Sequence, residues 1–138
     1  ENLEMQREYT YKALEEKRAE YNKYSTKVSE IGQKMRETDI WKPLKNQLKS
    51  LGYDIEEKEI KFENMISFII GLTKKDPKVL ISFVGNLALS EFQAVKLTFQ
   101  LTQMTNAYQK SQIISTDISN LTDQITSIDK QIASYGVN

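Results

Sequence analysis

The spacing of apolar residues near the start of the chain predicts one long helix. Over residues 3–37 they recur at alternating steps of three and four once the polar Lys17 is admitted to the series, and no proline interrupts them. This spacing places the side chains along one side of an α-helix and is typical of a heptad seam. The members of this seam are Leu14, Tyr21, Tyr24, Val28, Ile31 and Met35.

The last third of the chain carries a second and more regular seam. Ser90 and Gln93 have the spacing of a capping box, which predicts that a long helix runs from Glu91 to about Tyr135. Its first apolar series ends at Tyr108, six residues before Ile114, where a heptad needs seven, so we expect the packing to shift near residues 106–112. The second series contains Ile114, Ile118, Leu121, Ile125, Ile128, Ile132 and Tyr135, and its first six members are here called the Ile seam.

A short helix is expected just after the first long one. Thr38 or Asp39 can cap its start, Pro43 suits its first turn and Gly52 suits its end. Its apolar face is expected to contain Leu44, Leu48 and Leu51.

Two more short helices are predicted before the last long one. Asp54, at the capping-box spacing from Glu57, begins a helix that runs to about Ile70. Asp76 and Pro77 are suited to the cap and first turn of the next. Its expected apolar face contains Val79, Leu80, Phe83, Val84 and Leu87, widened by Ala88.

These elements predict an all-α protein with one elongated domain over residues 1–138. The long helices, at 1–37 and 91–135, are expected to form an antiparallel coiled-coil-like handle. A small three-helix head, residues 38–90, is inserted between them. Because the chain has no initiator Met and opens on a helical pattern, we also expect it to be a mature or excised segment.

Composition removes several kinds of chemistry. The 138 residues include no cysteine and no histidine, and the net charge is zero. Thiol nucleophiles, Ser-His-Asp arrangements and zinc fingers are therefore excluded, and nothing favours binding to nucleic acid. Asp117, Asp123 and Asp129 recur every six residues, about 120° apart around a helix, which predicts solvent positions and not a metal site. We expect no catalytic residues, no metal and no cofactor.

The Ile seam predicts a partner for the last helix. In an antiparallel handle it would oppose the first part of the chain, where Arg7, Thr10 and Lys17 stand at matching steps. Burying an aliphatic side chain is worth about 1.5–3 kcal/mol, so a half-polar neighbour leaves part of this energy unused. We infer that the seam meets something more, such as a second copy, another chain or a longer first helix.

The head offers two further candidate surfaces. Lys74, Lys75 and Lys78 decorate the connection between its apolar helices, and a basic tip of this kind could contact an anionic lipid or an acidic partner. Three apolar side chains fall outside the tightest predicted faces and are candidates for an exposed patch, namely Phe68, Ile81 and Leu89.

The favoured function is a non-enzymatic helical interaction or scaffold module. Its handle would mediate assembly or act as a spacer, and its head would dock a protein partner. One alternative is a membrane-active or pore-forming protein that inserts the helix pair at 62–89, although each apolar run is too short to span a bilayer. Another is a helical subunit of a bacterial secretion system or surface appendage.

Overall fold

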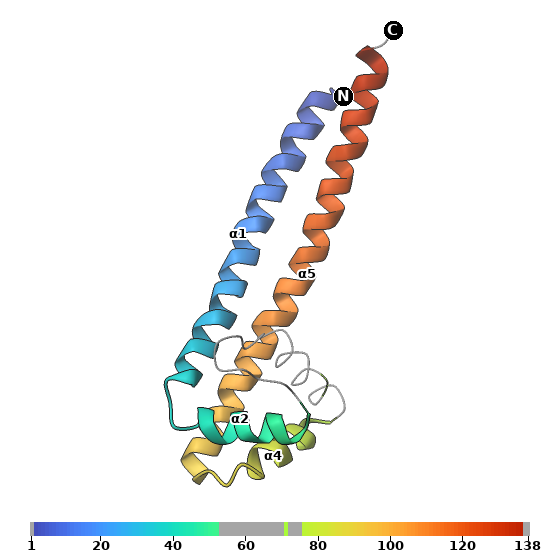
Figure 1. Cartoon of the computed structure of the whole chain (residues 1–138). Helices are drawn as coiled ribbons and strands as arrows, with labels where there is room; N and C mark the ends of the chain where they lie inside the picture. Colours follow the sequence, from blue (N-terminus) through green and yellow to red (C-terminus); the bar gives the residue numbers. More distant parts are fainter. Residues whose placement is uncertain (1, 53–70, 72–75, 137–138) are drawn as a thin grey trace. The chain divides into compact units, whose positions relative to one another are not determined.

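All the elements in the described part of the chain are helices. The computed structural model describes residues 2–52, 71 and 76–136. The helices in these ranges are α1 (Leu3–Arg36), α2 (Trp41–Ser50), α4 (Pro77–Gly85) and α5 (Glu91–Gly136) (Figure 1). The predicted all-α fold with two long packed helices is confirmed. The helix predicted at 55–70 lies outside the described residues.

The chain divides into two compact units. The hairpin unit contains Glu1–Thr26 and Gln109–Asn138, and the inner unit contains Lys27–Tyr108. Both long helices contribute to both units. On α5 the division falls at the place where the apolar series is out of phase, between Tyr108 and Ile114. The helix continues unbroken through this place.

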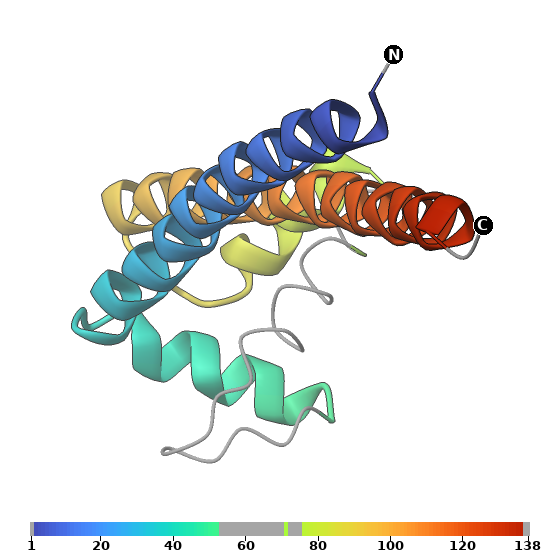
Figure 2. The same cartoon turned by 90° about the horizontal axis from the view of Figure 1, so that it is seen from above.

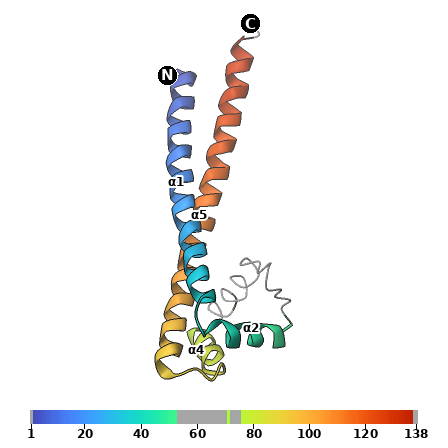
Figure 3. The same cartoon turned by 60° about the vertical axis from the view of Figure 1, so that its left-hand side comes forward.

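In the hairpin unit, α1 and α5 run side by side in opposite directions (Figures 1 and 3). Leu14 from α1 and both Ile114 and Ile125 from α5 are buried. Ser111 is also buried and is one of the few polar side chains that are. Its small size suits a position where two helices approach closely.

The inner unit begins with a tight corner between α1 and α2 (Figure 2). Thr38 does not cap α2 as predicted, because its hydroxyl instead donates to the carbonyl of Met35 at 2.8 Å and closes the end of α1. Asp39 does not cap α2 either. The N-cap residue is Ile40, which makes no side-chain capping bond and is buried. Burial of Ile40 therefore replaces the predicted polar cap at this corner.

The predicted start signals of α4 and α5 are confirmed. The Asp76 carboxylate accepts a hydrogen bond from the Lys78 backbone N–H at 2.9 Å. The Gln93 backbone N–H donates to the Ser90 hydroxyl at 3.2 Å, and the Ser90 backbone N–H donates to the Gln93 side chain at 3.3 Å. Each arrangement satisfies backbone N–H groups that have no partner inside the helix.

The predicted ends of the short helices need two corrections. Leu51 leaves the apolar face of α2 and is exposed, because α2 ends at Ser50 and Gly52 takes a left-handed φ of 93°. Ala88 does not widen the face of α4. That helix ends at Gly85, and Ala88 is exposed with a φ of 55° in the turn before α5.

The core of the inner unit draws apolar side chains from all four described helices. The faces predicted on α2 and α4 are otherwise buried apart from the half-buried Val79, and Leu97, Leu101 and Met104 of the first α5 series are fully enclosed, whereas Tyr108 is half-buried. Among the described residues of this unit, the buried apolar ones are Val28, Met35, Ile40, Leu44, Leu48, Leu80, Phe83, Val84, Leu87, Leu97, Leu101, Met104 and Ala107.

The N-cap of α4 should contribute measurably to stability. We expect Asp76→Ala to lower the free energy of unfolding by about 0.5–2 kcal/mol, because the Lys78 N–H loses its acceptor. Urea denaturation followed by circular dichroism measures this change. Asp39→Ala is the matched control, an exposed aspartate at a helix start that caps nothing, and should change stability by no more than about 0.5 kcal/mol. Equal losses in the two variants would contradict the assignment.

Candidate functional site

The Ile seam lies only partly inside the hairpin. Ile114 and Ile125 are buried, and the other four members remain half-buried. These four are Ile118, Leu121, Ile128 and Ile132.

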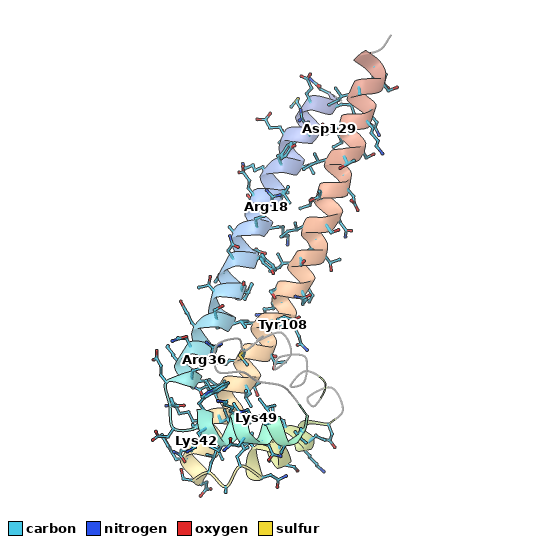
Figure 4. The ribbon with its side chains drawn as sticks, viewed as in Figure 1. Arg18, Arg36, Lys42, Lys49, Tyr108 and Asp129 are labelled. Atoms are coloured by element: carbon cyan, nitrogen blue, oxygen red, sulfur yellow. The ribbon has the colours of Figure 1, made fainter. Side chains whose placement is uncertain are left out.

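Two ion pairs cross between α1 and α5. Arg7 Nε lies 2.9 Å from Asp129 Oδ1, and Lys17 Nζ lies 3.4 Å from Asp117 Oδ2. Asp129 stands on α5 where α1 runs alongside (Figure 4). Asp117 and Asp129 keep the solvent exposure predicted for them, with 41% and 45% of their side-chain surface accessible, and each also makes an ion pair with α1. These aspartates oppose the basic residues at the polar steps of the α1 seam.

The ion pairs favour the observed antiparallel register. The earlier basic residue of α1 meets the later aspartate of α5, as opposite helix directions require. Each side chain is more than a third exposed, so each pair is worth about 0–1 kcal/mol. Their contribution is to the choice of register more than to stability.

A shallow groove of about 430 Å³ lies between residues of α1 and α5 in the hairpin unit. Its lining is mostly uncharged and polar, so it offers hydrogen-bonding groups but no charged residue to orient a ligand. The lining residues are Gln6, Tyr9, Thr10, Gln124, Ser127 and Ile128.

The candidate residues of the head have different outcomes. Ile81 is 62% exposed on α4, as a docking residue would need to be, whereas Leu89 is half-buried. Lys78 is exposed beside the α4 cap. Phe68, Lys74 and Lys75 lie outside the described residues.

A more extensive apolar surface, missed in the sequence analysis, lies at the start of α5. Phe92, Val95 and Phe99 are 79%, 66% and 61% exposed, and their spacing of three and four places them on one side of the helix. We call these three residues the Phe face. The apolar series predicted along this part of α5 runs through Leu97 and Leu101 on another side of the helix. The signal for a second series was present in the same segment.

Polar and charged residues border the Phe face. Glu91 and Lys96 are both exposed. Thr102, one turn beyond Phe99, donates its hydroxyl to the Thr98 carbonyl at 2.8 Å, so its polar atom already has a partner. Asn106 follows a turn later and is exposed. A compact apolar stripe with a polar border is typical of a docking surface.

Two further kinds of site, a metal site and a membrane-spanning helix, are not found among the described residues. Among them, no three acidic side chains gather to hold a metal ion. None of the helices formed by these residues has the length and hydropathy needed to cross a membrane. Comparison with family models, with curated proteins and with solved structures gives no match to this chain.

Ile125 should be essential to the hairpin, whereas Ile113 should not. Ile125 is 6% exposed, so Ile125→Asp places a charge in an apolar interface and should lower the unfolding free energy by about 3 kcal/mol or more. Ile113 is 64% exposed on the same helix, so Ile113→Asp should cost no more than about 0.5 kcal/mol. Urea denaturation of both variants tests this. If Ile125→Asp unfolds at the wild-type midpoint, Ile125 does not contribute to hairpin packing.

Proposed function

We propose that this protein is a non-enzymatic helical interaction module that docks a macromolecular partner through the Phe face. The observation that carries the proposal is the exposure of Phe92, Val95 and Phe99 on one side of α5, while the opposite side of that helix is enclosed in the core. The helix is thus held rigidly by its own core and presents a second apolar stripe to solvent.

Hydrophobicity supports docking at this surface. Aromatic side chains bury about 150–250 Å² each and dominate many interfaces. Two phenylalanines within two turns therefore leave substantial apolar area in water, and covering it is favourable at roughly 25 cal/mol per Å². Scattered exposed apolar residues are ordinary on protein surfaces, whereas an aligned set bordered by polar residues favours an interface.

Charge and composition favour a protein partner. The Phe face is bordered by one acidic and one basic residue, Glu91 and Lys96, so it has no net positive charge to attract phosphates. The absence of cysteine and histidine from the sequence removes thiol nucleophiles and the commonest general base. In this proposal the hairpin unit serves as a spacer, and its half-buried isoleucines give a secondary surface for assembly.

Site-specific photo-crosslinking tests the proposal. A benzophenone amino acid at position 95 should produce saturable adducts, either between copies of the purified chain or with a protein of its source cell. The matched control carries the same group at Asn46, an exposed residue of α2, and should give no such adducts. The proposal is overturned if position 95 yields no adduct to any macromolecule, or the same adducts as position 46. Adducts formed only with lipid vesicles would instead favour the membrane-active alternative.

A further inference from the structure

We infer that the partner of the Phe face is a second copy of this chain, with the two α5 helices side by side and parallel over about residues 91–106. This inference rests on the proposed function and specifies its partner. It follows from the heptad positions that the exposed side of α5 defines, and from the charges at the edges of that side.

The exposed residues fall at the core positions of a coiled-coil heptad. If Phe92 and Phe99 occupy a positions, then Val95 and Thr102 occupy d positions. Thr102 suits an apolar d site because its hydroxyl is bonded to the Thr98 carbonyl within its own helix. Its methyl group is then available for packing against a neighbouring helix.

The charges match a parallel pair. In this register Glu91 falls at a g position and Lys96 at the following e position. In a parallel dimer, g of one copy faces the next e of the other, so Glu91 and Lys96 of opposite copies meet on both sides of the seam. In an antiparallel dimer g faces g and e faces e, which separates these charges. Both residues are exposed and therefore accessible to the second copy.

Asn106 supports the same arrangement. It occupies the next a position and is exposed. In a parallel dimer the two Asn106 side chains face each other, and paired asparagines at an a position select a two-stranded, in-register state at a cost in stability. The apolar part of the interface is short, so the dimer is small and weak, with a dissociation constant of about 1–100 μM.

Charge reversal in the full chain tests the pairing. Sedimentation equilibrium should show a concentration-dependent dimer for the wild type. Glu91→Lys and Lys96→Glu should each weaken it by about tenfold, because like charges then meet on both sides. The double variant should restore dimerisation, and so should an equimolar mixture of the two single variants. These residues are exposed, so folding, checked by circular dichroism, should survive.

Disulfide trapping tests the direction. The chain has no native cysteine, so Asn106→Cys introduces a single thiol. Under oxidation it should form a disulfide-linked dimer, as facing a positions in a parallel pair allow. Asn46→Cys on α2 is the control and should form no disulfide-linked dimer.

Three outcomes would overturn the inference. They are a monomer at all concentrations up to about 1 mM, no rescue by the double variant and the mixture, or failure of Asn106→Cys to cross-link faster than Asn46→Cys. The proposed function fails on a different result, since it requires only that position 95 contacts some macromolecule. An adduct at position 95 to another protein, with a monomeric chain, would retain the proposed function and exclude the second copy.

Discussion

A straight α-helix at the edge of a core can bury only one of its sides. The first part of α5 carries apolar residues on two sides. Phe92 and Leu97 are five residues apart, which is about 140° around the helix axis. The inner unit encloses Leu97 and Leu101 completely, so Phe92 and Phe99 must point to solvent. The rotation chosen by the core therefore creates the exposed surface on which the proposed docking depends.

In the hairpin, α1 and α5 are only partly complementary. The Ile seam supplies more aliphatic surface than α1 can cover, because α1 places basic residues at steps where a coiled coil would have apolar ones. Arg7 and Lys17 meet Asp129 and Asp117, which reconciles these positions with a paired helix. The consequence is a helix pair with few fully buried side chains and a polar groove beside them. Such a pair keeps its direction while leaving apolar edges half-exposed.

Local signals predicted most of the fold because they act within a few residues. Asp76 caps α4 and the Ser90–Gln93 box begins α5, as their spacing indicated. The corner before α2 was misjudged because Thr38 had two possible backbone partners. Its hydroxyl bonds to the Met35 carbonyl, and the N-cap position of α2 is occupied by the buried Ile40. Leu51 was misplaced although Gly52 was predicted to end this helix, because α2 already ends at Ser50 and Leu51 lies in the turn that follows.

The candidate site was predicted less well than the fold. Ile81 was anticipated as an exposed apolar residue, but the Phe face was not, because in a linear pattern two apolar series on one helix are equally good candidates for burial. The sequence by itself determined the described helices, the caps of α4 and α5 and the change of phase between the two apolar series of α5, since these follow from spacing along a single backbone. Only the tertiary structure decided which side of α5 is enclosed and which aspartates meet the basic residues of α1. Those outcomes depend on competition between distant segments for the same surface. The spacing of residues within one segment does not reveal which of them will pack together.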